Sequence, residues 1–419
     1  MGAYFLDWLN LFFRWFHVIA GVAWIGASFY FVWLDMSLQK PPKWKADKGI
    51  SGDLWAVHGG GFYEIAKYKL EPEEMPKTLH WFKWEAYTTW LTGAAMLSIV
   101  YYANATAYLI DPSKVQFTPF AAIATSVAFL LGSYAIYELI VRSRIGKNAM
   151  MFSITIFVLM ILATWGSYQL FSDRASFIHV GAILGTIMAG NVFFGIMPAQ
   201  RALVDCVRRG EKPGKEVANL ALMARNRSLM NNYFTLPLIF TMISNHYPMM
   251  YSFGDGLGWL VLVFVGVITA TARHYFNQKH LGNNKPGYLI VPAIATLALI
   301  FWMRPEPIKP LPAPAPVAAE TTTDGTDATG AEAVAVSASA DDSIMPIIQE
   351  RCTTCHAEQP TQAGFNAPPA GIILQTPEDL KIHKAKVVTA VQSSYMPLGN
   401  ITQMTDEERA QVVAYTSGL

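Results

Sequence analysis

Long apolar stretches separated by short polar segments run through most of the chain. A helix needs about 20 residues to cross about 30 Å of hydrocarbon. Stretches of about this length lie near residues 11–34, 80–102, 119–141, 149–171, 175–198, 229–247, 256–274 and 286–303. Aromatic residues gather at their ends, as they do at membrane interfaces; examples are Trp8, Trp33, Trp81, Tyr101 and Trp302. The pattern predicts an all-α bundle of eight transmembrane helices within residues 1–304.

Composition agrees with this interpretation. Hydrophobic residues make up 53% of the chain and charged residues only 15%, which is typical of a protein that lies largely in lipid. The net charge of +1 gives no reason to expect nucleic acid as a partner. The first residues lack a basic segment and a small-residue cleavage site, so we expect no cleavable signal peptide.

The basic residues predict the orientation of the bundle. Segments 35–79, 142–148, 199–228 and 275–285, together with Arg273 at a span end, contain 20 Lys and Arg residues. The connections between the other ends of the spans contain only two such residues, Lys114 and Arg174. By the positive-inside rule the first set is cytoplasmic, and an eight-span bundle then has both ends of its chain outside. We interpret Arg225 and Arg227 as such topology charges.

The composition changes abruptly after the last span. Residues 305–342 are rich in Pro, Ala, Thr and Gly and contain no aromatic residue, which predicts a disordered linker. Residues 343–419 again carry helical patterns on both sides of a cysteine motif. We expect a small all-α domain there.

Cys352, Cys355 and His356 form a C-x-x-C-H motif, the attachment signature of a c-type haem. Two thiols bind the haem vinyl groups and the histidine is the proximal iron ligand. Met396, in a turn-forming Tyr-Met-Pro-Leu-Gly segment, is the predicted second ligand, with Met404 as the alternative. These features predict a class I cytochrome c domain with covalent haem c, whose iron is held by His356 and Met396.

Two histidines stand inside predicted spans, where ionisable groups are costly. His17 and His179 each follow an aromatic residue by two positions, precede Val and have Ala three positions later. This likeness suggests that the bundle could be a 4+4 parallel repeat. Either histidine could ligate a b-type haem, or both could form hydrogen bonds to the backbone or neighbouring helices. Both interpretations stay open.

Further polar residues gather at the predicted cytoplasmic ends of the spans. His58 precedes three glycines that could let backbone amides approach a ligand, or could simply form a flexible turn. Lys83 and Glu85 lie among aromatic residues at the start of the second span. They could pair with each other, or they could bind an anion and move a proton. Asn191 lies in the fifth span and Asn232 in the sixth.

Segments 15–26, 57–64 and 80–85, with the eight spans and the terminal C-x-x-C-H motif, resemble the bacterial membrane-bound urate oxidase (urate hydroxylase) family. That family fuses an integral membrane domain to a C-terminal cytochrome c, and the likeness covers essentially the whole chain. It implies oxidation of urate to 5-hydroxyisourate in purine degradation. Electrons would pass to the chain's own haem c, then to a soluble cytochrome c or a terminal oxidase of the respiratory chain. It also implies a bacterial inner-membrane location with the cytochrome domain in the periplasm.

Urate is a planar anion, so its site needs a cation or amide donors, an aromatic wall and a base. The candidate catalytic residues are Glu85, His80, Lys83 and His58. The candidate substrate-binding residues are Trp84, Gly60, Gly61, Glu64, Asn191 and Asn232. An alternative function is a quinol-linked electron-transfer cytochrome whose membrane domain binds quinone and haem b. A transporter-like domain carrying a sensing cytochrome is a third.

Overall fold

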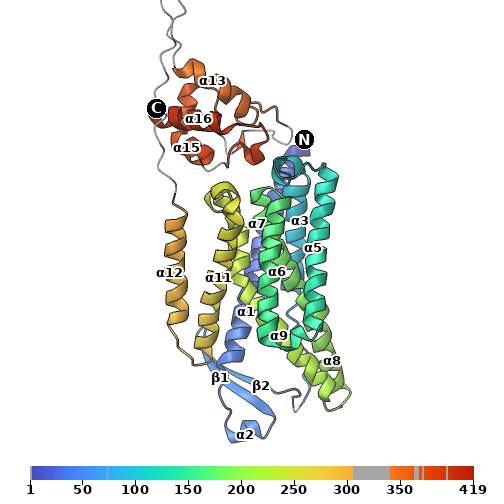
Figure 1. The fold of residues 1–419 in the computed structure, drawn as a ribbon. Helices are drawn as coiled ribbons and strands as arrows, with labels where there is room; N and C mark the ends of the chain where they lie inside the picture. The colour runs from blue at the N-terminus through green and yellow to red at the C-terminus, as the bar shows by residue number, and fades with distance from the viewer. Residues whose placement is uncertain (1, 73, 305–339, 363–367, 370–371, 393–394) are drawn as a thin grey trace, which may run out of the picture. The chain divides into compact units, whose positions relative to one another are not determined.

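The computed structural model describes residues 2–72, 74–304, 340–362, 368–369, 372–392 and 395–419. The chain divides into two compact units, Met1–Met303 and Arg304–Leu419 (Figure 1). Most of the predicted linker lies outside the described residues, which resume at residue 340.

Each predicted span overlaps a helix within the described part of the first unit. These helices are α1 Gly2–Ser37, α3 Trp84–Leu97, α5 Pro119–Arg142, α6 Ala149–Leu170, α7 Asp173–Gly190, α9 Lys215–Ile243, α11 Gly254–His280 and α12 Gly287–Trp302. Among the residues described, five helices are long and apolar enough to cross a membrane: Trp8–Ser37, Pro119–Arg142, Ala149–Leu170, Asp173–Arg208 and Gly256–His280. α12 is a shorter apolar helix. The unit has the helices of a membrane protein, while eight crossings remain a prediction.

Local sequence signals set the starts of several helices. The side chains of Thr118, Asn148 and Ser172 accept hydrogen bonds from backbone N–H groups in the first turns of α5, α6 and α7. Such caps satisfy donors that have no partner inside the helix. Short elements occupy the connections: α2 Lys43–Ala46, α4 Ala105–Tyr108, η2 Ile145–Lys147, η4 Ser244–His246 and α10 Pro248–Tyr251.

A β-hairpin corrects the all-α expectation for this unit. β1 Ile50–His58 pairs antiparallel with β2 Gly61–Tyr68 at the same end of the bundle as the connection after α1 (Figure 1). Gly59 and Gly60 form the turn with φ values of 58° and 82°, which favour glycine in a two-residue hairpin loop. The glycine run that suggested a ligand cradle is therefore the turn residue pair that this hairpin requires.

α7 is the most buried of the long helices, and small residues let it pack closely. A Cβ atom on Gly181 would lie 2.2 Å from Thr241 Oγ1 of α9, and one on Gly190 would lie 2.2 Å from the Tyr134 ring of α5. Close approach through small residues is the usual way in which helices associate in lipid, where hydrophobicity does not drive them together. This packing brings the polar residues of α5, α7 and α9 into contact.

A π-helical segment, η3 Asn191–Ile196, joins α7 to α8 Met197–Arg208, just as η1 Ser98–Tyr102 extends α3. At η3, Arg227 of α9 forms two hydrogen bonds to the Glu138 carboxylate, at 2.7 and 2.9 Å, and a third to Asn191 at 2.9 Å. Asn191 also bonds to Tyr137 and Asn231. We call these five residues the Arg227 cluster. Arg227 is thus a buried, paired charge rather than a topology charge, whereas exposed Arg225 pairs with Asp35 at 2.8 Å.

The second unit contains α13 Ala340–Arg351, α14 Pro377–Ile382, α15 Lys384–Gln392, η6 Leu398–Asn400 and α16 Asp406–Gly418. Ile344 and Ile348 of α13 pack with Leu380, Val412 and other apolar residues in one core. Arg351 donates two hydrogen bonds to Glu408 at the start of α16, where Thr405 and Glu408 form a capping box. The helices predicted on either side of the cysteine motif are therefore present.

A substitution at Gly195 tests whether close packing around Arg227 stabilises the fold. A Cβ atom there would lie 2.4 Å from Arg227 Cδ, so Gly195→Ala forces the buried guanidinium away from Glu138. We expect a loss of about 1–3 kcal/mol in unfolding free energy, as for other overpacked sites. The measurement is thermal unfolding of the purified full chain. Gly132→Ala is the matched control, because nothing lies within 4 Å of that position. Equal effects of the two substitutions would contradict this account.

Candidate functional site

A second buried arginine stands where α1, α9 and α11 pack together. Arg273 of α11 is 5% exposed, and its guanidinium carbon lies 3.9 Å from the centroid of the Phe29 ring. Its Nε donates to Asn232 Oδ1 at 2.8 Å, and Asn277 Nδ2 donates to the same oxygen at 3.1 Å. We call Phe29, Asn232, Arg273 and Asn277 the Arg273 cluster.

The Arg273 cluster has charge and hydrogen-bonding capacity that the protein does not use. Among the described residues, no carboxylate forms an ion pair with Arg273, and its only hydrogen bond is the one from Nε. Asn232 Nδ2 and Asn277 Oδ1 are buried and have no hydrogen-bond partner in the described part of the chain. The cluster therefore presents a cation, an amide donor and an amide acceptor beside one aromatic ring.

The predicted catalytic residues at the second span lie at the start of α3. Glu85 is in the first turn of the helix, and its buried Oε2 has no partner among the described residues. Lys83 Nζ lies 5.6 Å from the ring centroid of the exposed Trp84, and exposed His80 packs edge-on against Phe82. Lys83 and Glu85 do not form an ion pair here. Of this group, Glu85 has the unsatisfied buried oxygen expected of a reactive carboxylate.

His58, Gly60 and Gly61 lie at the tip of the hairpin, and His58 and Gly60 are exposed. Glu64 lies further along β2, where it pairs with Lys45. Lys45 is buried and also bonds to Asp53 at 2.7 Å, and these two carboxylates raise the pKa of its ammonium group. Glu64 thus helps to hold the hairpin together, and none of the contacts of this group joins it to Glu85 or to either arginine cluster.

The two intramembrane histidines are engaged by their own helices and neighbours. His179 is fully buried, with Nδ1 bonded to the Ala175 carbonyl at 2.7 Å and Nε2 bonded to Ser126 at 2.6 Å. Because both ring nitrogens are used and the ring stacks on Phe171 at 4.2 Å, His179 does not fit as an axial ligand of a b-type haem. His17 Nδ1 bonds to the Thr89 carbonyl and the Thr92 hydroxyl, both at 3.0 Å. We derive no step through a b-type haem.

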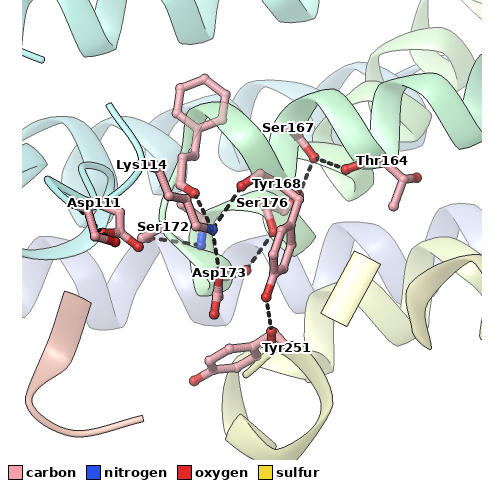
Figure 2. Close-up of polar contacts among 12 residues, drawn as sticks. Asp111, Lys114, Thr164, Ser167, Tyr168, Ser172, Asp173, Ser176 and Tyr251 are labelled. Carbon is pink, nitrogen blue, oxygen red and sulfur yellow. Dashed lines mark hydrogen bonds and ion pairs between the residues drawn. The ribbon is translucent and has the colours of Figure 1, made fainter. Parts of the chain in front are cut away.

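Another polar cluster, around Lys114, links the end of α6 to the start of α7 (Figure 2). Lys114 Nζ donates to the carbonyls of Tyr168 and Phe171, pairs with Asp173 and lies 3.9 Å from the Tyr168 ring centroid. The Tyr168 hydroxyl donates to the carbonyl of Tyr251 at 3.1 Å. The lysine is fully used by these contacts, so this cluster is structural.

An open groove of about 1180 Å³ runs between α5, α6, α9 and α11. Its walls are mainly apolar, with Arg227, Tyr233 and His274 among the polar residues that line it. The Tyr233 hydroxyl and His274 Nδ1 are 2.7 Å apart. Arg273, Asn232 and Asn277 do not line this groove. Tyr233, however, also interacts with the Asn277 amide and lies near the Arg273 charge, so the groove borders the Arg273 cluster.

In the second unit, the C-x-x-C-H segment turns directly out of α13. The backbone N–H of Cys355 and that of His356 both donate to the Cys352 carbonyl, at 3.2 and 2.9 Å, and neither cysteine forms a disulfide. His356 Nδ1 lies 3.0 Å from the Ile372 carbonyl, which leaves Nε2 as the ligand nitrogen. Met396 is half-buried, and Arg409 of α16 donates to its carbonyl. Met404 is buried in the apolar core.

This donor set fits a c-type haem. Burial raises the pKa of the Cys352 thiol to about 12 and lowers the pKa of His356, so both groups stay neutral at pH 7. Neutral imidazole is the metal-binding form of histidine. Within the described residues no group of three or more His, Cys, Asp and Glu side chains could hold a metal ion. A haem iron needs only two protein ligands, for which His356 and Met396 are the candidates.

Comparison with known proteins places the first unit in a family. A family model described as "Urate oxidase N-terminal" matches residues 3–304. The chain belongs to the urate oxidase N-terminal family. No curated protein and no solved structure matches the chain. Membership indicates a urate-related oxidase, and the apolar helices of the matched region indicate a membrane protein.

In this urate oxidase family member, three internal polar residues are not evident from the sequence pattern: Arg273, Asn277 and Glu138. Arg273 was assigned to a span end, although Arg273 and Asn277 are one helical turn apart on an apolar helix. Glu138 lies inside the predicted third span, and a carboxylate there is itself a signal of a buried partner. The adjacent amides Asn231 and Asn232 face two different clusters, which no linear pattern reveals.

Met396 and Met404 provide a matched pair for the haem site of the C-terminal unit. Met396→Ala removes the proposed iron ligand, so we expect loss of the methionine-to-iron charge-transfer band and a lower haem potential. Met404→Leu conserves core volume and should leave both unchanged. Absorption spectra and a redox titration of the full chain measure the difference. A wild-type spectrum in Met396→Ala would show that the second ligand lies elsewhere.

Proposed function

We propose that this protein is a membrane-bound urate oxidase that converts urate to 5-hydroxyisourate and passes the electrons to a haem c on its own C-terminal unit. One observation carries the proposal: a urate oxidase family unit and a complete haem c donor set occur in a single chain. A soluble cytochrome c or a terminal oxidase is the proposed final acceptor.

The reaction balances with haem c as the immediate electron acceptor and the proposed final acceptor reoxidising it. Urate and one water molecule give 5-hydroxyisourate, two electrons and two protons, and the oxygen of water becomes bonded to the ring. A haem c accepts one electron at a time, so each urate reduces two haems or one haem twice. The protein must hold the substrate through both electron transfers and accept its protons.

Glu85 is the proposed base. Its buried Oε2 lacks a partner among the described residues, so it is free to accept a proton, whereas His80 is exposed and packed against Phe82. Cys352 and Cys355 would hold the haem, with His356 and Met396 on its iron. A methionine and histidine ligand pair raises the iron potential, which favours electron transfer from an organic donor.

We further propose an inner-membrane location with the C-terminal unit in the periplasm. The support is the imbalance of 20 basic residues against two between alternate connections. Periplasmic placement also matches the compartment in which the family resemblance puts haem attachment.

The large groove favours the second candidate, a quinol-linked cytochrome. Its apolar walls suit an isoprenoid tail, and Tyr233 and His274 could bond to a quinone oxygen. This function would not use urate. The two candidates therefore differ in which reductant delivers electrons to the haem.

Anaerobic reduction of the oxidised full chain separates the two functions. Urate added in substoichiometric amounts should reduce two equivalents of haem c per urate, followed by the haem absorption bands. Allantoin, which has lost the conjugated purine ring, is the control and should reduce none. Reduction by a quinol but not by urate would establish the second candidate and refute the first.

A further inference from the structure

We infer that the Arg273 cluster is the binding site for the purine anion. This inference rests on the proposed function and adds the position and chemistry of its substrate site. The ligand class is a small, planar, singly charged heterocycle with hydrogen-bonding groups along its edge.

The unpaired charge of Arg273 indicates a ligand. A buried guanidinium always carries its proton, and burying a charge is expensive unless a counter-charge and hydrogen bonds meet it. Arg273 is 5% exposed, yet no described carboxylate pairs with it and its Nε makes its single hydrogen bond. An anionic ligand would supply the missing charge, and the terminal guanidinium nitrogens can bind two acceptors side by side.

Arg227 provides the internal comparison. It is 3% exposed and lies on α9, the helix that carries Asn232, but the protein supplies Glu138 in a two-bond pairing and adds Asn191. Within its described residues the unit therefore gives one buried arginine a counter-charge, although Arg227 Nε itself has no partner, and leaves the other without an acid. A binding site for an anion requires such an arginine, whose charge is not already paired with an acidic side chain.

Two unsatisfied amide groups beside Arg273 indicate the same ligand position. Asn232 Nδ2 and Asn277 Oδ1 are a buried donor and a buried acceptor without partners in the described residues, and both belong to side chains that meet at Asn232 Oδ1. A purine anion carries ring N–H groups and carbonyl oxygens around one plane, so it can satisfy both. Phe29 covers one face of the guanidinium and restricts a ligand to its edge.

The position of the Arg273 cluster favours a compact ligand. Arg227 lines the large apolar groove, whereas the Arg273 cluster only borders it, through the contact of Tyr233 with Asn277. A lipid phosphate with its acyl chains is therefore better placed to reach Arg227 than Arg273. A compact ligand without a tail fits the Arg273 cluster better.

Asn232→Asp is the decisive substitution. It places a carboxylate within hydrogen-bond distance of Arg273 Nε, where the amide oxygen now lies at 2.8 Å, and so gives the arginine an internal counter-charge. We expect the variant to fold with at least wild-type thermal stability, and to bind the anion about 100-fold more weakly because the carboxylate competes with it. A residue with only a structural role would not combine these two results.

Binding is measured by calorimetry on the full holoprotein with xanthine, a planar purine that lacks the 8-oxo group of urate and serves as an unreactive anion at mildly alkaline pH. Urate-dependent haem reduction is measured in parallel. Arg273→Met should lose binding about 100-fold, and Arg225→Met, at an exposed arginine paired with Asp35, should bind like wild type.

The outcomes are distinguishable. If Asn232→Asp and Arg273→Met fold and retain wild-type xanthine affinity and urate KM, the inference is overturned while the proposed function stands. If wild type binds xanthine in an Arg273-dependent manner but urate does not reduce the haem, the site stands and the proposed function fails. A phospholipid retained by wild type and lost from Arg273→Met in native mass spectrometry, without xanthine binding, would overturn the inference in favour of a lipid site.

Discussion

The membrane unit depends on how it accommodates positive charge among apolar helices. An unpaired charge in such surroundings destabilises a fold strongly, so each buried arginine requires an explanation. Arg227 has one within the protein, because Glu138, Asn191 and the space left by Gly195 surround it. In the described part of the chain, Arg273 bonds to an amide oxygen and packs on an aromatic face, with no acid beside it. We therefore assign a structural role to Arg227 and a ligand-binding role to Arg273.

Hydrophobic periodicity predicted the helical positions of the first unit well, because lipid requires long apolar segments whose backbone groups are satisfied internally. It failed at the hairpin, where Trp55 and Val57 are two positions apart on β1 and Phe62 pairs with Val57 from β2, a pattern too short to stand out beside the spans. The glycines at its turn were ambiguous in sequence and are resolved by their positive φ values. The capped helices around the cysteine motif were predictable because their signals are local.

The candidate site was less predictable because its residues come from distant parts of the chain. Phe29, Asn232 and Arg273 belong to three helices, and only their packing shows that they meet. Asn232 could be selected from its polarity, but its partner could not. Conversely, His179 looked like a ligand in sequence and is satisfied by Ser126 and Ala175. The proposed haem c donors, by contrast, lie close together in sequence, apart from Met396, so the motif alone predicts them, and they stay a prediction.

A structure of the full holoprotein with a bound purine anion tests the central claim most directly. The account predicts planar density against the edge of the Arg273 guanidinium, bonded to Asn232 Nδ2 and Asn277 Oδ1. Density for the purine at another place, with Arg273 paired to an acidic side chain of the protein, would contradict it.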